Sequence, residues 1–556
     1  MNKVTLPSLG VTLEVEPGAS LLETLRHAGV DLESPCDGSG TCGKCRVKLA
    51  AHERAHVRES AHDLLSDAER EEGFVLACQA SICGDLEIET DAANAEGEGL
   101  RILSEGHGLD VALEPWISKT FDPATASTRI LAGNTLLGVE PGDTTGRLYG
   151  LAIDIGTTTL VAALVDLRTG CELATASSLN PQARYGQDVL SRIKLGSAPD
   201  GLAKLQGDLI AELNRHAADA AAQAGVDPRD IYEAVFSGNT TMLYLAVGTD
   251  PATLGKYPYT LTRRGAEHVG ATGIGLEISP LGLVYLPPVM SAYVGADITS
   301  GILAADLPHT KGVVLFVDIG TNGEMVLGID GKLTATSTAA GPAFEGMNIT
   351  CGMRAGRGAV ERVSLSDDGL AFATIGSTEP SGLCGSGLLD VVGELAAHGG
   401  VDKNGRFQHN GTAPDKPWKS QWERVDGKPV FRITGPVYLS QKDVRQVQLA
   451  KAAIRAGIEL MLKENGLTPA RVDRVLIAGS FGFHLRTESL INLGLLPRAF
   501  AGRVEFVGNT SRTGAQALLL NHPARGRLAR VAGTVNVLEL ANNPAFETTF
   551  LQSLAF

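Results

Sequence analysis

The stretch that decides the fold reads Leu151-Ala152-Ile153-Asp154-Ile155-Gly156-Thr157-Thr158-Thr159-Leu160-Val161, and a similar stretch, Leu315-Phe316-Val317-Asp318-Ile319-Gly320-Thr321-Asn322-Gly323-Glu324-Met325-Val326, begins 164 residues later. In each copy an apolar strand leads into Asp-x-Gly-Thr and then into a second apolar strand, which predicts a β-hairpin. The turn of such a hairpin exposes backbone N–H groups and hydroxyls that can surround phosphate oxygens. One copy would be weak evidence, but two copies after similar strands indicate a pair of phosphate-binding loops.

These loops predict a site for ATP and Mg²⁺. Asp154 and Asp318 would lie at strand ends, where carboxylates hold Mg²⁺ directly or through its waters. A third apolar strand, Val475–Ala478, enters a glycine-rich turn whose lack of side chains would let an adenosine lie against the backbone. The residues expected to bind the nucleotide are Gly156, Thr157, Thr158, Thr159, Gly320, Thr321, Asn322, Gly479, Ser480, Phe481 and Gly482.

Weaker signals surround these loops. Gly341, Gly385 and Ser386 lie in turns that could line the same cleft, although glycine turns are common. Ser440 and Asp443 predict the start of a long amphipathic helix. Its face with Arg445, Gln448 and Lys451 would either reach the adenosine or face solvent.

Four cysteines near the N-terminus have the spacing of a ferredoxin-type [2Fe–2S] site. They are Cys36, Cys42, Cys45 and Cys78, in the pattern C-x5-C-x2-C followed by a distant fourth cysteine. Gly38, Gly40 and Gly43 would let the loop curl around a cluster. Cys83 is a rival for the fourth position, and a zinc site is the alternative for the whole quartet, although zinc ligands more often come in two closely spaced pairs. The pattern favours electron transfer.

The residues around these cysteines predict a small β-grasp ferredoxin over residues 1–90. Residues 4–6 and 11–15 alternate apolar and polar side chains across a Pro-Ser-Leu-Gly turn, which predicts a hairpin. Ser20 and Glu23 form a capping-box pattern at the start of a helix with an apolar stripe, and Gly29 would end it. Residues 46–49 predict the next strand.

Composition places the chain among multidomain α/β proteins. It has 556 residues, 66 of them glycine, with 44% hydrophobic and 20% charged residues. The net charge of −15 argues against a nucleic acid partner, since phosphate binding draws on clustered Lys and Arg. No apolar run is long enough to span a membrane. We therefore expect a cytoplasmic protein, in which eight cysteines serve metal ligation better than disulfides.

The segment 91–148 has weak periodicity and is rich in Pro, Gly, Thr and Ala from Asp122 to Thr145. It predicts a linker or a reduced middle domain, and an ordered strap packed on the next domain is the alternative. A linker would let a redox centre visit both its donor and its acceptor.

The order of two phosphate loops and a late glycine-rich loop resembles the actin, Hsp70 and sugar-kinase superfamily across residues 149–556. This resemblance implies two ribonuclease-H-like lobes, roughly 149–310 and 311–556, with Mg-ATP between them. It also implies that Asp297 is the base that activates the attacking water, with Glu324 as the second candidate. The alternative for Asp297 is a helix cap.

The ferredoxin pattern ahead of this ATPase, together with residues 180–186, 340–346 and 448–453, resembles the ATP-dependent reductive activators of corrinoid proteins. The resemblance implies one-electron reduction of Co(II) to Co(I) in a partner corrinoid protein or corrinoid-dependent methyltransferase. It also implies a low-potential electron donor upstream, and it is compatible with a homodimer.

Three other functions compete with this one. An activator of a radical dehydratase uses the same ATPase fold, but with a shared [4Fe–4S] cluster, and Cys171, Cys351 and Cys384 are isolated in sequence. A kinase with a fused redox sensor would transfer phosphate to a hydroxyl group. A non-catalytic, ATP-gated redox sensor or chaperone would bind ATP without reducing cobalt.

Overall fold

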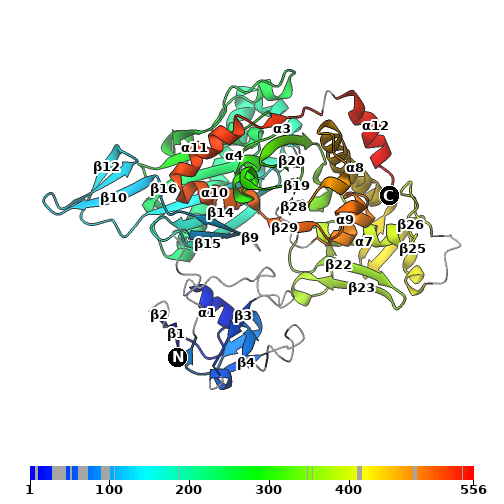
Figure 1. Ribbon diagram of the computed structural model, residues 1–556, viewed down its shortest axis with the longest axis horizontal. Helices are drawn as coiled ribbons and strands as arrows, with labels where there is room; N and C mark the ends of the chain where they lie inside the picture. Colours follow the sequence, from blue (N-terminus) through cyan, green and yellow to red (C-terminus); the bar gives the residue numbers. More distant parts are fainter. Residues whose placement is uncertain are drawn as a thin grey trace. The chain divides into compact units, whose positions relative to one another are not determined.

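The protein folds into two compact units, Met1–Ala112 and Leu113–Phe556, each with its own apolar core (Figure 1). The structure is a computed structural model. It describes residues 1–6, 11–27, 45–50, 53–59, 65, 70, 73–88, 100–104, 107–186, 188–346, 348–353, 355–409, 416–479, 485–540 and 543–556.

The first unit is a small β-rich fold. Strands β1 (Asn2–Leu6) and β2 (Val11–Val15) pair antiparallel, which confirms the predicted hairpin, and β1 also pairs in parallel with β7 (Leu86–Glu87). Helix α1 (Leu21–His27) lies where the helix was predicted. The remaining strands form three pairs, which are β3 (Arg46–Lys48) with β5 (Phe74–Leu76), β4 (Val57–Glu59) with β6 (Ala80–Ile82), and β8 (Leu100–Ser104) with β9 (His107–Val111).

Apolar side chains of the hairpin and the helix meet in one core. Val4 and Leu6 point inward from alternate positions of β1 and are fully buried, as are Leu21 and Leu25 on α1. Burying each such side chain stabilises the fold by about 1.5–3 kcal/mol. The order of hairpin, helix and further strands is that of the β-grasp ferredoxin expected from the sequence.

The second unit contains two six-stranded sheets built on the same plan. The first has the order β15-β14-β13-β16-β18-β17. Its strands β13, β14 and β15 form an antiparallel meander, β16 pairs in parallel with β13, and β18 pairs in parallel with β16. The strand bounds are β13 (Tyr149–Ile155), β14 (Thr159–Asp166), β15 (Glu172–Leu179), β16 (Ile231–Gly238), β17 (Glu267–Gly270) and β18 (Leu283–Leu286).

The second sheet repeats this arrangement in the order β29-β28-β19-β20-β21-β30. Again a meander, β19-β20-β21, is followed by a strand, β28, that pairs in parallel with its first strand, and by β29, which pairs in parallel with β28. The two predicted loop hairpins are thereby confirmed as β13–β14 and β19–β20. The strand bounds are β19 (Val313–Ile319), β20 (Gly323–Ile329), β21 (Lys332–Thr338), β28 (Arg474–Ala478), β29 (Val504–Gly508) and β30 (Asn536–Val537).

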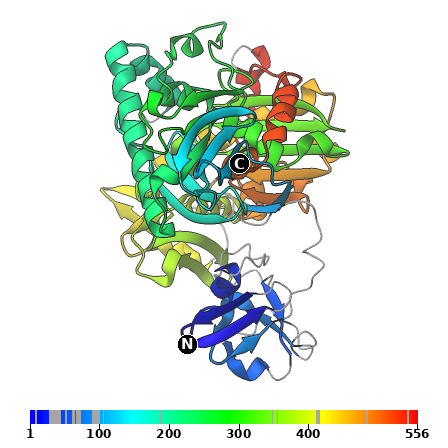
Figure 2. The ribbon, with the colours of Figure 1, turned by 90° about the vertical axis from the view of Figure 1, so that its left-hand side faces the viewer.

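Each sheet is covered by helices. The long helix α4 (Pro199–Ala224) packs along β14 and β15, as Figure 2 shows, and α8 (Gln441–Glu464) packs on β20 and β21. Within the described part of the chain, none of the helices combines the length and apolar composition of a bilayer-spanning segment. The other helices of this unit are α3 (Val189–Gly196), α5 (Thr240–Ala246), α7 (Gly385–Ala397), α9 (Thr487–Asn492), α11 (His522–Ala532) and α12 (Pro544–Ser553).

Two helices cross between the sheets. Helix α6 (Ala296–Ala304) follows the first sheet in sequence, yet its Ile298 and Ile302 share a core with β19 and β28 of the second sheet. Helix α10 (Thr510–Leu520) follows the second sheet and packs on β13 and β16 of the first. The two helices touch closely, since a Cβ on Gly514 would lie 2.2 Å from the Ser300 carbonyl oxygen. This exchange joins the two lobes.

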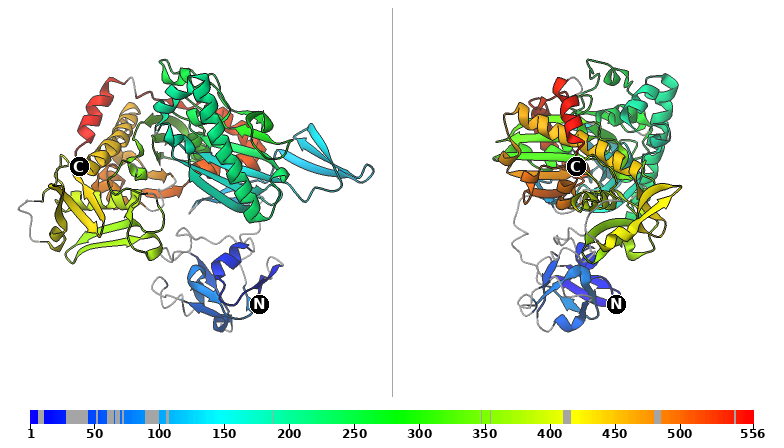
Figure 3. Two further views of the ribbon diagram at one scale, coloured as in Figure 1. Left: turned by 180° about the vertical axis from the view of Figure 1, so that it is seen from behind. Right: turned by 90° about the vertical axis from the view of Figure 1, so that its right-hand side faces the viewer.

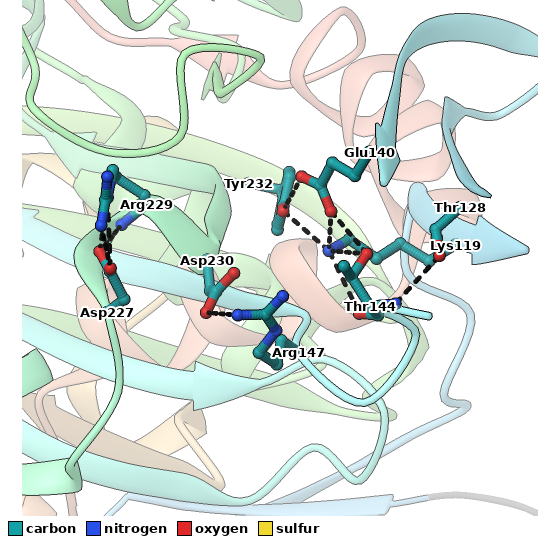
Figure 4. A network of polar contacts seen from close by, with 9 residues as sticks. All are labelled: Lys119, Thr128, Glu140, Thr144, Arg147, Asp227, Arg229, Asp230 and Tyr232. Carbon is teal, nitrogen blue, oxygen red and sulfur yellow. Dashed lines mark hydrogen bonds and ion pairs between the residues drawn. The ribbon is translucent and has the colours of Figure 1, made fainter. Parts of the chain in front are cut away.

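A three-stranded antiparallel sheet of β10 (Ile117–Asp122), β11 (Ser127–Ala132) and β12 (Thr135–Pro141) precedes the first lobe. A buried polar network ties it to β16 (Figure 4). Lys119 Nζ donates to Glu140 at 3.0 Å and to the Tyr232 hydroxyl at 2.7 Å. Part of the segment 91–148 is thus regular structure, and its residues from Leu113 onward belong to the second unit.

The chain between β21 and α8 forms two small sheets. One has the order β23-β22-β24 and the other β25-β26-β27. Helix α7 packs on β22, and α12 lies along α8 (Figure 3). Their bounds are β22 (Ala359–Ser366), β23 (Gly369–Thr374), β24 (Gly382–Leu383), β25 (Trp422–Val425), β26 (Lys428–Thr434) and β27 (Val437–Ser440).

Candidate functional site

A cleft lies where the two hairpin turns meet between the lobes. The space inside it and at its open mouth is about 590 Å³. Its walls come from both turns, from the start of α6 and from the loops that precede α5 and α10. The lining residues are Asp154, Gly156, Thr157, Thr158, Thr159, Asn239, Asp297, Asp318, Ile319, Gly320, Thr321, Asn322, Glu324, Glu345, Gly479, Asn509 and Ser511.

The two turns contact each other directly. The hydroxyls of Thr158 and Thr321 lie 3.0 Å apart and share a hydrogen bond. Each turn is tightly closed, because Gly156 N–H donates to the Thr159 carbonyl at 2.9 Å and Gly320 N–H donates to the Asn322 carbonyl at 3.0 Å. Residues that are 163 positions apart therefore form one continuous wall of backbone and hydroxyl groups.

Hydrogen-bond donors hold the first turn from behind. Asn180 Nδ2 donates to the Gly156 carbonyl at 2.8 Å, and Arg192 Nη2 donates to the Thr157 carbonyl at 2.6 Å. Asn239 Nδ2 donates to Thr157 Oγ1 at 2.9 Å. The turn is thereby fixed in one conformation.

Asp154 is held by the N-terminus of α10. Asn509 Nδ2 donates to one of its carboxylate oxygens at 2.8 Å and Ser511 Oγ to the other at 2.7 Å. Burial raises the pKa of Asp154, and these two hydrogen bonds oppose that rise. The carboxylate is thus oriented by a helix more than 350 residues away in sequence.

Three further buried carboxyl groups face the cleft. Burial raises the pKa of Asp297 to about 7, and the nearby Asp154 adds to the shift. Burial also raises the pKa of Asp318 to about 8, with smaller contributions from Asp297 and Asp154. The pKa of Glu324 is well above its usual range for the same reason, helped by Asp297 and Asp318. Burial and the neighbouring carboxylates both disfavour the charged form of each group. Such carboxyl groups are suited to bind a cation or to accept a proton.

The chemistry of these carboxyl groups fits Mg²⁺ bound together with phosphate. Among the described residues, no three Asp, Glu, His or Cys side chains converge closely enough to hold a metal ion by themselves. Mg²⁺ usually keeps several waters and takes few carboxylates. Asp154 and Asp318 would supply such carboxylates.

Most of the residues predicted from sequence line this one cleft. These are Asp154, Asp297, Asp318, Glu324, Gly156, Thr157, Thr158, Thr159, Gly320, Thr321, Asn322 and Gly479. Asp297 also lies in the first turn of α6, where its Oδ1 accepts from Ile298 N–H at 2.8 Å. Ser480, Phe481 and Gly482 lie outside the described residues.

Gly341, Gly385 and Ser386 are not among the lining residues. Gly341 N–H donates to the Thr321 carbonyl at 2.8 Å, so it supports the second turn from behind. Gly385 begins α7, and a Cβ there would lie 1.8 Å from the Phe344 carbonyl oxygen. Gly385 thus allows close backbone packing beside the cleft wall, whereas Gly341 adopts a positive φ of 80° that side chains disfavour.

The predicted capping box of α8 is confirmed at Ser440 and Asp443. Of the three residues named on its face, Arg445 is exposed to solvent, which is one of the two expected placements. Gln448 and Lys451 are instead buried: Gln448 Nε2 donates to the Leu554 carbonyl at 3.0 Å, and Lys451 Nζ donates to the Ala555 carbonyl. The segment that follows α12 covers these two side chains, a tertiary contact that the amphipathic pattern does not reveal.

Sequence reasoning missed Asn239, Glu345, Asn509 and Ser511. A signal for three of them exists as a second internal repeat, Ser237-Gly238-Asn239-Thr240-Thr241 and Val507-Gly508-Asn509-Thr510-Ser511. Each copy ends a strand and begins a helix, with the asparagine side chain as the N-cap. No local pattern marks Glu345, whose carboxylate accepts from the Thr321 hydroxyl at 2.5 Å.

In the first unit the structure describes two of the four predicted cluster ligands. Cys45 Sγ and Cys78 Sγ lie 3.2 Å apart beside the apolar core. Cys83 is exposed, and its thiol points toward the Ser81 carbonyl. Cys36 and Cys42 lie outside the described residues. Two adjacent sulfurs from separate segments fit the thiolate ligands of an iron–sulfur cluster.

Three protein-family models match the chain in succession. A 2Fe-2S iron-sulfur cluster binding domain matches residues 4–83, the RACo middle region matches residues 149–310, and the C-terminal domain of RACo, the ASKHA domain, matches residues 312–556. The expected fold, a ferredoxin domain with an ASKHA-type ATPase fold, is thereby confirmed.

Characterised proteins match over most of the chain. The corrinoid activation enzyme RamQ of Eubacterium limosum is 30% identical and aligns with 100% of this chain and 99% of its own. The [Co(II) methylated amine-specific corrinoid protein] reductase of Methanosarcina barkeri is 25% identical over 74% of this chain and 77% of its own. A solved structure described as a reductive activator for corrinoid, iron-sulfur protein superposes with a TM-score of 0.75 at 32% identity, covering 100% of this chain and 98% of the other. Full-length similarity at this level, together with the cysteine pair and the two-turn cleft, shows that the chain belongs to the family of reductive activators of corrinoid proteins.

Proposed function

We propose that this protein reduces the cobalt of a partner corrinoid protein from Co(II) to Co(I) by one electron, with ATP driving the transfer. The observation that carries the proposal is the presence, in one chain, of a ferredoxin domain and an acid-lined cleft between two phosphate-type loops. Relatives that match the chain are named for corrinoid activation and Co(II) reduction. The substrate class follows from that family membership.

The electron-transfer module is residues 1–90. Cys36, Cys42, Cys45 and Cys78 would hold a [2Fe–2S] cluster, which supplies one-electron chemistry at low potential. The pairing of Cys45 with Cys78 favours Cys78 over Cys83 as the fourth ligand. The Cys45 side chain is buried, which would shield that side of the cluster from water.

The ATPase module is residues 149–556, with lobes of about 149–310 and 311–556 and the segment 91–148 as the connection. The backbone N–H groups and hydroxyls of the two turns would bind the phosphates, and Asp154 and Asp318 would bind Mg²⁺ through its waters. Asp297 would take the proton of the attacking water, with Glu324 as the second candidate. Adenosine would lie against residues 479–482.

ATP is needed because the transfer is uphill. A plant-type cluster has a potential near −400 mV. If the cobalt acceptor lies about 100 mV lower, one electron must gain about 2.3 kcal/mol. ATP can supply this only by binding one conformation of the complex more tightly than another. Closure of the two lobes around the nucleotide is such a difference.

The structure favours this function over activation of a radical dehydratase. That alternative needs a cluster inside the ATPase fold. Cys171 is exposed between strands of the first sheet, whereas Cys351 and Cys384 lie near the small sheets of the second lobe. A low-potential donor upstream, a location in the cytoplasm and a homodimer stay predictions.

The test is an anaerobic assay. Reduced, cluster-loaded protein is mixed with a Co(II) corrinoid protein, and Co(I) is followed by its visible spectrum with and without Mg-ATP. We expect ATP-dependent Co(I) formation that is lost in Cys42→Ala, which cannot hold the cluster, and in Asp318→Ala, which cannot bind Mg-ATP correctly. If cobalt stays Co(II) with several unrelated corrinoid partners while ATP is still hydrolysed, the proposal is wrong, and a kinase or redox sensor becomes the better hypothesis.

A further inference from the structure

Arg192 is a buried arginine directly behind the first turn. It lies on α3 and has no exposed surface. Its guanidinium donates to the carbonyls of Thr157 at 2.6 Å and Gly186 at 2.9 Å, to Gln182 Oε1 at 3.2 Å, and toward the sulfur of Met242 at 3.3 Å. All four acceptors are uncharged.

The charge of this guanidinium has no close counter-ion among the described residues. No carboxylate there forms an ion pair with it, and Asp188 and Glu345 favour its charged form only through space. Burial lowers the pKa of Arg192 to about 10, so the side chain is still positively charged at neutral pH. A buried charge is costly unless it is paired. A bound anion close to Arg192 would therefore be favoured electrostatically.

The turn itself shows where that anion would lie. The carbonyls of Gly156, Thr157 and Thr158 are bonded to the Asn180 side chain, Arg192 and the Asn180 backbone N–H. In a trans peptide group the N–H points opposite to the C=O. The N–H groups that follow these carbonyls are thus directed away from Asn180 and Arg192, the side on which the turn lines the cleft.

The cleft lining has no positive charge of its own. It contains five carboxyl groups, those of Asp154, Asp297, Asp318, Glu324 and Glu345, and neither lysine nor arginine among the described residues. A nucleotide carries several negative charges on its phosphates, so Mg²⁺ and oriented dipoles must offset them. Arg192 places a fixed positive charge behind this surface, and the peptide group between Thr157 and Thr158 lies between the two.

We propose that Arg192 is a positioning residue for phosphate binding. It fixes the Thr157 carbonyl and polarises the peptide group between Thr157 and Thr158, so that the Thr158 N–H binds a nucleotide phosphate more strongly. This rests on the proposed function in one respect, that the cleft binds a nucleotide. The residues around Arg192 in the sequence do not indicate this role.

The test compares phosphate-bearing and phosphate-free ligands. Affinities for Mg-ATP, Mg-ADP and adenosine are measured by calorimetry, with competition for the weaker ligand, on the full-length protein and on Arg192→Met and Arg192→Lys. We expect Arg192→Met to weaken ATP and ADP by about 10- to 100-fold, the usual effect of a lost hydrogen bond to a charged group, and to leave adenosine within about twofold. Arg192→Lys keeps the charge and one donor, so it should recover most of the lost affinity.

Arg525→Met is the matched control. Arg525 on α11 is also a buried arginine of this unit, but it pairs with the Glu233 carboxylate at 2.7 Å and does not line the cleft. Its loss should lower the melting temperature without changing the ratio of ATP to adenosine affinity. If Arg192→Met does not fold, Arg192→Gln, which keeps hydrogen-bond donors but loses the charge, is measured in its place, with the same selective loss of ATP and ADP affinity expected.

The outcomes separate the two proposals. Two results would refute the role of Arg192 while nucleotide binding by the wild type stands. In the first, Arg192→Met binds ATP and ADP as tightly as the wild type does. In the second, Arg192→Met loses affinity for adenosine to the same extent as for ATP and ADP. If methionine is tolerated as well as lysine, the charge has no role and the inference also fails. If the wild type binds no nucleotide, the proposed function fails, and the inference fails with it.

Discussion

The two hairpin turns share a sequence pattern and a sheet topology but differ in what surrounds them. The first turn is held by donors, namely Asn180, Arg192 and Asn239, and its Asp154 accepts two hydrogen bonds from α10. The second turn lies among acids instead. Glu345 accepts from the Thr321 hydroxyl, and Glu324 is buried beside Asp318.

This difference shows that the same hairpin turn, present twice in one chain, can serve two functions. Donors behind the first turn leave it rigid and electrostatically suited to an anion. Carboxyl groups with raised pKa values around the second turn suit a cation and the movement of a proton. The repeat supplies the geometry twice, and the neighbouring elements decide the chemistry of each copy.

The largest expected effect concerns the acids near the second turn. Asp297→Asn should lower the rate of ATP hydrolysis by about 10²- to 10⁴-fold, the usual contribution of a general base, while Mg-ATP still binds. Single-turnover hydrolysis at saturating Mg-ATP measures the rate, and a fluorescent nucleotide measures binding. If Glu324→Gln causes the larger loss instead, the base is Glu324.

A pH experiment tests whether the pKa of Asp318 is raised in the folded protein. The pKa of Asp318 is raised to about 8 in the folded protein, so the folded state binds more protons than the unfolded state between about pH 4 and 8. Stability of the nucleotide-free protein should therefore fall as the pH rises through this range. Asp318→Asn removes the titrating group and should be more stable than the wild type by about 1–3 kcal/mol at pH 8, and by less at pH 5.

Calorimetric melting temperatures of the two proteins from pH 5 to pH 8 give this comparison. Titrating groups far from the cleft contribute equally to both proteins, so the difference between them reports Asp318 together with its effect on neighbouring carboxyl groups such as Glu324. A difference that does not grow with pH would show that Asp318 ionises normally, and the contrast between the two turns would be weaker than proposed.

On the side of the first turn, Asn180→Ala should weaken Mg-ATP binding by about 10-fold, because the Gly156 carbonyl loses its partner and the turn loses its fixed conformation. The hydrolysis rate of bound ATP should change little, since the acids are untouched. Calorimetric titration measures the affinity. Asn521→Ala is the control, since it removes another buried N-cap asparagine outside the cleft. Equal losses in the two variants would contradict a role specific to the turn.

The smallest effect is expected where the two turns meet. Thr158→Val keeps the shape of the side chain but removes its hydrogen bond with Thr321. We expect a loss of about threefold in ATP affinity, since one neutral hydrogen bond contributes about 1 kcal/mol or less. Thr336→Val, which removes a buried hydroxyl from the second sheet away from the cleft, should leave affinity unchanged. An unchanged Thr158→Val affinity would show that the turns bind the nucleotide independently.

Much of the fold could be predicted because its signals are local. Alternation in β1 and β2, the cap of α1, and the strands on both sides of Asp154 and Asp318 depend on near neighbours in sequence. What covers Gln448 and Lys451 on α8 was not predicted, because an amphipathic pattern marks which side is buried without naming its partner. Its partner was the segment after α12, about 100 residues away.

The two turns, the cysteine pattern and the family could all be inferred from local sequence. Each is a short run of residues whose chemistry follows from its own backbone and side chains. Only the tertiary structure decided that Asn509 and Ser511 orient Asp154, that Glu345 meets Thr321, and that Arg192 lies behind Thr157. These contacts join different elements, and they form only when the packing of α3, α10 and the 3-10 turn Pro342–Glu345 brings separate segments within hydrogen-bond distance.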